Sequence, residues 1–254
     1  MKNLKIILLL PLFYSCQKYS SPPLDFYEKK LRESSIEDTK GIVIDELWKE
    51  RDSLSYLRLK NVKFIYLKSV KYLPKWIIKF DSLSIISNTV DKSHIKSFED
   101  LSSLKVLKTL NLSQSDIDII PESLYKVTSL EYFNIEDNNI KSINKNINQL
   151  KDLKSLFVSD NPLTTIPKEV CELSKLESLV LENTKIKELS KCLGTLQYLN
   201  WINISGTQIT EFPIEILNAP KLETIHARGL KLKNYKEVKA ICEKRNITFY
   251  YDHE

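Results

Sequence analysis

Residues 107–129, LKTLNLSQSDIDIIPESLYKVTS, set a pattern that residues 130–152 repeat as LEYFNIEDNNIKSINKNINQLKD. In both copies the first residue is a leucine, and apolar residues follow three and five places later. The spacing continues through residue 227, so each position of the unit forms a column with a 23-residue period. The first column is Leu107, Leu130, Leu153, Leu176, Leu199 and Leu222, and the second is Leu110, Phe133, Leu156, Leu179, Ile202 and Ile225.

Apolar and polar residues alternate at the start of each unit, as in Leu110, Asn111 and Leu112, which predicts a short strand with one buried face. Further apolar residues, such as Ile120 and Leu124, lie on the return path of the same unit. One unit cannot bury so many apolar side chains alone, whereas stacked units bury them against one another. An array of amphipathic helices is excluded because the alternation does not fit the helical period.

The unit reads L-x-x-L-x-L-x-x-N-x-L, which resembles the leucine-rich repeat family over residues 54–232. The resemblance implies an α/β fold: a curved, right-handed solenoid with a parallel sheet on its concave face. Asn138 and Asn161 occupy the asparagine place, where the family's asparagine bonds the backbone of the turn. Three other units carry a hydroxyl there that can do part of this work: Ser115, Thr184 and Thr207.

The N-terminus is typical of an export signal. Lys2 and Lys5 precede an apolar run over residues 6–13, which is too short to span a bilayer. A small residue, Ser15, precedes Cys16, and residues 1–16 resemble a bacterial lipoprotein signal in which Cys16 carries the lipid. The bulky residues before Ser15 depart from that pattern, so an ordinary signal peptide with a chance cysteine is the alternative. The residue after Cys16 is Gln17, for which the resemblance implies an outer-membrane destination.

Segments flanking the repeats predict caps. Residues 17–23 are polar and suit a tether, and residues 24–53 have a helical pattern that predicts an N-terminal cap. Within residues 54–90 the repeats are degenerate: aligning Phe80 with Leu107 makes this unit longer than the others and predicts a four-residue insertion in residues 91–98. Residues 233–254 predict a C-terminal cap, with a helix over residues 234–243 and a final strand over residues 247–251.

Catalytic and metal-binding patterns are missing from the sequence. His94, His226 and His253 are far apart, no C-x-x-C occurs, and four glycines leave no Gly-rich phosphate loop. We therefore expect no enzyme activity, no cofactor and no metal. The net charge of +5 is spread as single lysines, which indicates solubility rather than nucleic-acid binding.

The cysteines other than Cys16 fall within or after the repeats. Cys242 belongs to a core-facing column and predicts buried packing. Cys171 and Cys192 lie on the convex side of neighbouring units, two template positions apart. An exported protein could join them by a disulfide, and the sequence leaves both the free and the joined forms open.

Strand residues between the core leucines form the predicted concave face. Four of these residues on consecutive strands are apolar, and with strands about 4.8 Å apart they would form a ridge on the order of 15 Å long. Acidic residues gather beside them, which suits a groove with apolar anchors and charges that steer a basic partner. Exposed aromatic residues also favour strands without any partner. The predicted binding residues are Tyr132, Phe157, Val180 and Trp201, with Glu136, Asp137, Asp160 and Glu182.

The sequence thus favours a non-enzymatic protein–protein interaction module, anchored at the cell envelope through Cys16, that binds a protein on its concave face. A secreted or periplasmic protein is the alternative location. One alternative function is a structural envelope protein that contacts peptidoglycan or other lipoproteins, and another is an effector or regulator of an enzyme. The identity of the partner, the membrane leaflet and the oligomeric state do not follow from the sequence.

Overall fold

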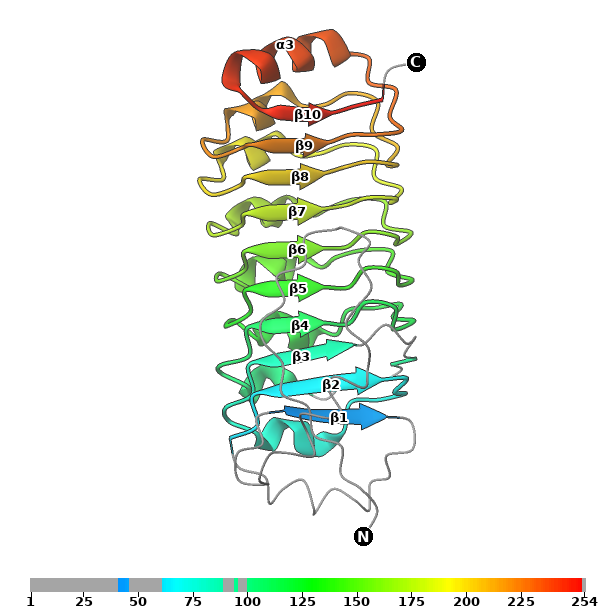
Figure 1. The fold of residues 1–254 in the computed structure, drawn as a ribbon, viewed down its shortest axis with the longest axis vertical. Coiled ribbons are helices and arrows are strands. Elements are labelled where there is room, and N and C mark those ends of the chain that lie inside the picture. The colour runs from blue at the N-terminus through cyan, green and yellow to red at the C-terminus, as the bar shows by residue number, and fades with distance from the viewer. Residues whose placement is uncertain (1–40, 46–60, 89–93, 96–99, 253–254) are drawn as a thin grey trace, which may run out of the picture.

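The computed structural model describes residues 41–45, 61–88, 94–95 and 100–252. In these residues ten strands form one sheet, in which neighbours are parallel and follow the order of the sequence. Figure 1 shows the strands stacked as an elongated column. The strands are β1 (Gly41–Asp45), β2 (Phe64–Lys68), β3 (Ile85–Asn88), β4 (Thr109–Asn111), β5 (Tyr132–Asn134), β6 (Ser155–Phe157), β7 (Ser178–Val180), β8 (Trp201–Asn203), β9 (Thr224–His226) and β10 (Thr248–Tyr250).

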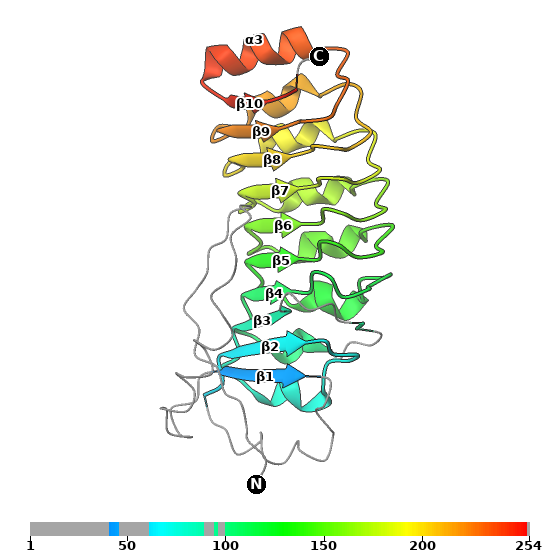
Figure 2. The same cartoon turned by 45° about the vertical axis from the view of Figure 1, so that its right-hand side comes forward.

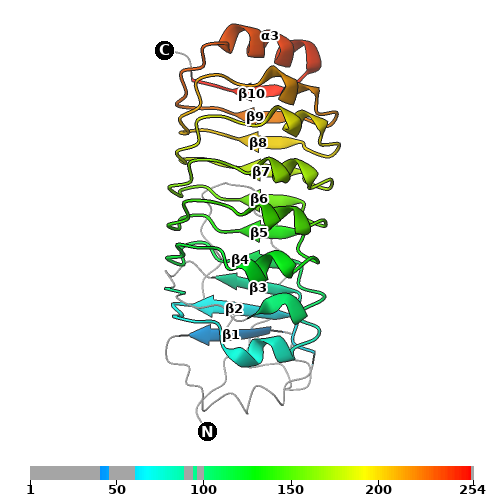
Figure 3. The ribbon, with the colours of Figure 1, turned by 180° about the vertical axis from the view of Figure 1, so that it is seen from behind.

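Short 3-10 helices line the side of the column opposite the sheet, as Figures 2 and 3 show. Four of the seven described 3-10 helices begin directly after a proline: Pro74, Pro121, Pro167 and Pro213. Proline fixes φ near −65° and lacks an N–H, which suits a helix start. The 3-10 helices are η3 (Lys75–Lys79), η4 (Leu101–Ser103), η5 (Glu122–Lys126), η6 (Lys145–Gln149), η7 (Lys168–Glu172), η8 (Lys191–Thr195) and η9 (Ile214–Asn218).

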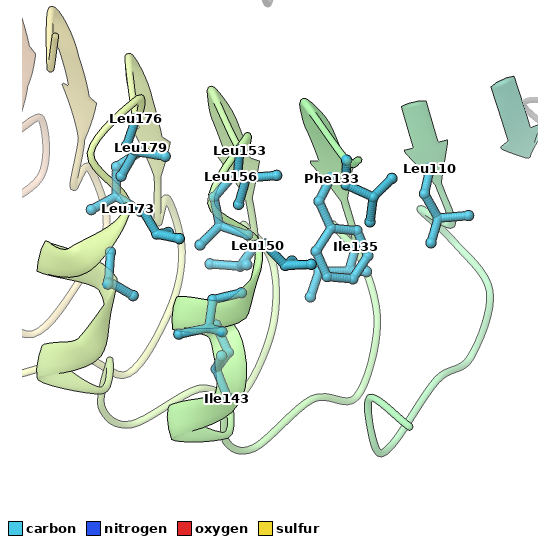
Figure 4. Close-up of a cluster of buried hydrophobic side chains, with 14 of the residues drawn as sticks. Leu110, Phe133, Ile135, Ile143, Leu150, Leu153, Leu156, Leu173, Leu176 and Leu179 are labelled. Atoms are coloured by element: carbon cyan, nitrogen blue, oxygen red, sulfur yellow. The ribbon is translucent and has the colours of Figure 1, made fainter. Parts of the chain in front are cut away.

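The predicted leucine columns form the core between the sheet and the 3-10 helices. Leu110 pairs with Phe133, and Phe133 pairs with Leu156, so the register between strands reproduces the 23-residue period. Figure 4 shows these side chains pointing into the interior of the column, where they are buried. Each fully buried side chain of this size contributes about 1.5–3 kcal/mol, so the stack supplies what one repeat lacks.

The asparagine place of the repeat works as the resemblance implies. The Asn161 side-chain amide donates to the backbone oxygens of Ile135, Val158 and Ser159 at 2.9–3.0 Å. Its Oδ1 atom accepts from the Ile140 N–H at 2.9 Å. One side chain thereby joins the turns of neighbouring repeats. Hydroxyl substitutes make fewer bonds, since the Thr184 hydroxyl donates only to the Leu181 oxygen, at 2.8 Å, among the described contacts.

The prediction of a helix over residues 24–53 is wrong for Gly41–Asp45, which is strand β1 and pairs with β2. Ile42 and Ile44 are both buried. Residues two apart share a face in a strand, and β-branched residues favour strands, so these isoleucines extend the core by one repeat. The rest of residues 24–53 and the first residues of the predicted repeats, 54–60, lie outside the described residues.

The alignment of Phe80 with Leu107 is also wrong. Ile86 pairs with Leu110, so this unit is only one residue longer than the regular repeat. Phe80 instead takes the place of Leu104, because its backbone oxygen accepts from Leu83 as that of Leu104 accepts from Leu107. Phe80 and Leu83 are both buried, so the apolar pattern alone fits either alignment.

Little of the predicted insertion lies within the described residues. Ile95 is buried and its N–H donates to the Ser115 oxygen at 2.9 Å, so this residue packs on the column instead of bulging from it. The preceding His94 N–H donates to the Val70 oxygen, also at 2.9 Å. The remainder of residues 91–98 lies outside the described part of the chain.

The C-terminal predictions are confirmed. Helix α3 (Tyr235–Arg245) lies over the end of the column, and β10 adds a last parallel strand beside β9 (Figure 1). Cys242 in α3 is buried, as expected, and burial raises the pKa of its thiol to about 11. Among the described residues, no helix combines the length and apolar composition that a membrane span requires.

Candidate functional site

The predicted binding residues lie on the outer face of the sheet, which we call the strand face. The pairing of strands β5 to β8 places one residue of each strand side by side in a first column: Tyr132, Ser155, Ser178 and Trp201. Two residues further along, Phe157, Val180, Asn203 and His226 form a second column. A third column follows where the backbone bonds continue past the strands: Glu136, Ser159, Glu182, Ser205 and Arg228.

Aromatic rings form a continuous series across this face, which we call the aromatic row. Successive ring centroids are 5.1, 6.1, 5.9 and 4.6 Å apart, within the range in which aromatic pairs attract each other. Its members are Tyr132, Phe157, Trp201, His226 and Tyr250. The rings of Phe157 on β6 and Trp201 on β8 meet although β7 runs between their strands.

The structure corrects the prediction that the four apolar residues are all exposed. Phe157 is 9% exposed and Val180 on β7 is 1% exposed, although neither belongs to the leucine core. The rings of Tyr132 and Trp201 pack against Phe157, and of the four residues only Tyr132 and Trp201 present partly exposed surface. The Nε1 atom of Trp201 is buried and has no hydrogen-bond partner among the described residues.

Sequence reasoning missed two members of the aromatic row. The predicted binding residues do not include His226, and Tyr250 lies beyond the last repeat. Tyr250 is exposed, pairs with His226 across β9 and β10, and lies under the guanidinium of Arg228, 5.5 Å from its ring centroid. Burial lowers the pKa of His226 and the positive charge of Arg228 lowers it further, against the smaller opposing effect of Glu182, so the surroundings favour the neutral ring.

Phe157→Ala is therefore expected to lower the free energy of unfolding by about 2 kcal/mol, because it removes a ring packed between two others. A urea titration followed by circular dichroism measures the change. Ser155→Ala on the same strand is the matched control, with an expected change within about 0.5 kcal/mol. An unchanged midpoint for Phe157→Ala would show that the rings do not pack as described.

The four predicted acidic residues belong to two different environments. Asp137 and Asp160 have left-handed backbone conformations, with φ of 51° and 54°, in the turn that follows each strand. Equivalent turn positions hold Gln114, Asn183, Gly206 and Gly229, all with positive φ. Glycine, asparagine and aspartate tolerate this conformation best, so the backbone explains both aspartates without any ligand.

Glu136 and Glu182 remain as acidic residues of the strand face itself. The Asn134 amide donates to Glu136 Oε2 at 3.0 Å, and the Asn203 amide donates to Glu182 Oε2 at 2.9 Å. Burial raises the pKa of Glu136, and the negative charges of Asp160 and Glu182 act in the same direction. The two glutamates occupy one column with Ser159 between them.

Cys171 in η7 and Cys192 in η8 form a disulfide, with their Cα atoms 5.8 Å apart. The sequence left open whether these cysteines are free or joined, and in the structure they are joined. The 3-10 helices that hold these cysteines, η7 and η8, belong to the series that lines the side of the column opposite the strand face (Figure 3). Within the described residues, no group of three or more His, Cys, Asp or Glu side chains could hold a metal ion. The chemistry of the strand face is therefore that of recognition: rings, amides, hydroxyls and carboxylates.

Comparison with known proteins bears on the repeat itself. The chain matches the Leucine rich repeat family model over residues 128–186 and again over residues 151–209. The second match begins one full repeat after the first. The chain is a leucine-rich-repeat protein. Its stacked parallel strands and asparagine-bonded turns are the structural expression of that motif.

Relatives of this leucine-rich-repeat protein share part of its length. A mouse volume-regulated anion channel subunit, LRRC8B, is 28% identical over 120 residues, which is 46% of this chain. The chain spans only 15% of the length of that curated relative.

Two of the solved structures with the same fold are bacterial proteins. A leucine-rich-repeat protein of Leptospira interrogans is 24% identical with a TM-score of 0.61, over 77% of this chain and 56% of that one. An internalin of Listeria monocytogenes, inlF, is 19% identical with a TM-score of 0.63, over 78% of this chain and 65% of that one. At these identities the likeness concerns the fold alone.

Proposed function

We propose that this leucine-rich-repeat protein is a non-enzymatic protein–protein interaction module that binds a partner protein on its strand face. The aromatic row carries the proposal: tryptophan and tyrosine, as in Trp201 and Tyr132, are the residues most enriched among binding hot spots. Their rings are held by neighbouring rings before any partner arrives, which reduces the entropy lost on binding. The bonded turns of the repeat keep the strands beneath them in register.

The charge of the strand face supports a protein partner over a nucleic acid. Glu136 and Glu182 lie beside the aromatic row, and Asp137 and Asp160 lie exposed at the adjoining turns. A phosphate backbone would be repelled by these carboxylates, since binding to nucleic acid depends on neutralising phosphates with lysine and arginine. A basic protein surface would be attracted instead, and its rate of association would fall as salt screens the charges.

The proposal includes attachment to the cell envelope through a lipid on Cys16, with the outer membrane as the expected location. The export-signal pattern of residues 1–16 motivates it. The disulfide between Cys171 and Cys192 supports folding outside the cytosol, because disulfides form and persist in oxidising compartments. The strand face would then be displayed at the envelope by the polar tether over residues 17–23.

Cys16→Ala is expected to move the protein from the detergent phase to the aqueous phase in a detergent partitioning assay, because the variant has no thiol to acylate. Ser21→Ala in the tether is the control and should partition like the wild type. If the Cys16 variant partitions like the wild type, Cys16 carries no lipid, and the alternative of an ordinary signal peptide is supported.

Site-specific photocrosslinking in intact cells of the native host tests the binding function. A photoreactive amino acid replaces Ser178, which lies on β7 between Tyr132 and Trp201 in the first column of the strand face. The control position is Lys191, exposed in η8 on the opposite side of the column. The proposal expects a discrete crosslinked protein from position 178 and none from position 191. Crosslinks to peptidoglycan alone, or from position 191 alone, would contradict it.

A further inference from the structure

We infer that Glu136, Ser159 and Glu182, which we call the acidic row, bind the cationic head group of a lysine or arginine side chain of the partner protein. The inference rests on the proposed function and deepens it, because it names the chemistry that the partner presents. Two rings of the aromatic row lie on the same strands, Phe157 two residues before Ser159 and Tyr132 four residues before Glu136, where they can cover the aliphatic stem of that side chain.

The two carboxylates are held open for a cation. Each uses its Oε2 atom to accept from an asparagine amide, at 3.0 Å from Asn134 for Glu136 and at 2.9 Å from Asn203 for Glu182. Among the described residues, no hydrogen bond of normal geometry reaches the other oxygen of either carboxylate. The two glutamates are two strands apart, about 10 Å along the sheet, so their side chains can converge on one charge lying over Ser159. Both asparagines also accept backbone N–H bonds, which fixes their amides toward the carboxylates.

Ser159 supplies an independent observation. It is 3% exposed, and its hydroxyl has no hydrogen-bond partner of normal geometry among the described residues. The hydroxyl nevertheless lies near enough to Glu136 to oppose the rise in the pKa of that carboxyl. Buried hydroxyls are nearly always bonded. A cation that draws the Glu136 carboxylate over Ser159 would give this hydroxyl the acceptor it lacks.

Several acidic residues elsewhere on the column are paired with lysines of the same chain. Glu131 lies 2.7 Å from both Lys108 and Lys154, one repeat before and one repeat after it. Asp152 and Glu215 likewise pair with lysines of adjacent repeats, at 2.6 and 2.7 Å. Lysines of neighbouring repeats thus balance these acids.

The acidic row lacks such a lysine. The residues beside the two glutamates in the column are Ser113, Ser159 and Ser205, and in the described part of the chain neither glutamate forms an ion pair. The one cation of the column, Arg228, lies two strands beyond Glu182, where it contacts Asp252 at 3.9 Å and the Tyr250 ring. The positive charge that balances Glu136 and Glu182 is therefore left to the partner.

A pair of short peptides tests the inference on the purified protein. The probe is N-acetyl-Ala-Lys-Ala amide, and its matched control has norleucine in place of lysine, which keeps the apolar stem and removes the charge. Binding is followed by NMR through the backbone amides of Glu136 and Ser159 and the indole N–H of Trp201. The lysine peptide is expected to shift these signals saturably, with an affinity at least fivefold higher than that of the norleucine peptide.

Variants of equal charge change identify where the cation binds. Glu136→Gln and Glu182→Gln are each expected to lower the affinity for the lysine peptide at least fivefold. Each substitution removes the negative charge of the carboxylate and keeps the shape of the side chain. Asp160→Asn removes the same charge from the adjoining turn, keeps the left-handed backbone, and should stay within twofold of the wild type. Equal effects of all three variants, or equal binding of the two peptides, would overturn the inference.

The outcome separates this inference from the proposed function. If the two peptides bind equally while position 178 still crosslinks to a protein, the inference that the acidic row binds a cation is wrong, but the proposed binding function of the strand face is supported. If the lysine peptide saturates and depends on the two glutamates but position 178 gives no crosslink, the cation site stands and the protein-binding function fails.

Discussion

Asn161→Ala is expected to lower the free energy of unfolding by about 3 kcal/mol or more, the largest effect we anticipate for a single substitution away from the leucine core. The change removes three donated bonds and one accepted bond and leaves buried backbone groups of two repeats without partners. Each unsatisfied buried group costs about 1–3 kcal/mol. Urea denaturation measures the total, and hydrogen exchange of the Ile140 amide, which donates to Asn161 Oδ1, reports the local opening.

Asn161→Thr is the matched variant, because the next repeat carries Thr184 in the same place. The Thr184 hydroxyl donates to only one backbone oxygen. We therefore expect Asn161→Thr to be only slightly more stable than Asn161→Ala. If Asn161→Ala unfolds at the wild-type urea concentration and the Ile140 amide stays protected, the turn does not depend on this side chain.

Removing the disulfide is expected to have the second large effect. The double variant Cys171→Ser, Cys192→Ser should lose about 3 kcal/mol, since a crosslink between residues 21 apart restricts the unfolded chain to that extent. Guanidinium denaturation with and without dithiothreitol measures the loss.

Reductant provides the control for this prediction. Dithiothreitol should lower the unfolding midpoint of the wild type to that of the double variant and leave the double variant unchanged, because the third described cysteine, Cys242, is buried and free. A wild-type midpoint that ignores reductant would show that Cys171 and Cys192 are not joined in solution.

The repeat architecture was predictable from the sequence because the 23-residue period carries it. Leu110, Phe133 and Leu156 pair across adjacent strands as their spacing requires, and Asn161 bonds the turn as its place implies. Prediction failed where the pattern is ambiguous. Phe80 and Leu83 are both apolar and three residues apart, so only the strand register decides which of them matches Leu107.

The candidate site was predictable in direction but not in packing. Alternation along each strand correctly pointed Tyr132, Phe157 and Trp201 away from the core. It could not show that these rings lean across strands and bury Phe157, because such contacts depend on side-chain rotamers. Tyr250 was missed because it lies beyond the last repeat, although the alternation of Thr248, Phe249 and Tyr250 placed it on the strand face.

The separation of the acidic residues into two environments also needed the structure. Asp137 and Glu136 are adjacent in sequence, yet their environments differ. Asp137 has a left-handed backbone conformation in the turn, whereas Glu136 lies on the sheet and accepts a hydrogen bond from Asn134. In the sequence alone, both residues count only as negative charges. Only the backbone conformation shows that the left-handed turn explains the two aspartates, whereas no such explanation applies to the two glutamates.

Binding of the crosslinked partner to Trp201→Ala tests the central claim, that the strand face is the recognition surface. The matched control is Tyr198→Ala, since Tyr198 is also an exposed aromatic residue but lies in the loop before β8, beside Lys221. Calorimetric titration at a temperature well below the melting point of both variants measures their affinities. We predict that Trp201→Ala weakens binding about 30-fold, which corresponds to about 2 kcal/mol for the loss of an anchor, and that Tyr198→Ala binds like the wild type. Wild-type affinity for Trp201→Ala, or an equal loss in both variants, would contradict the account.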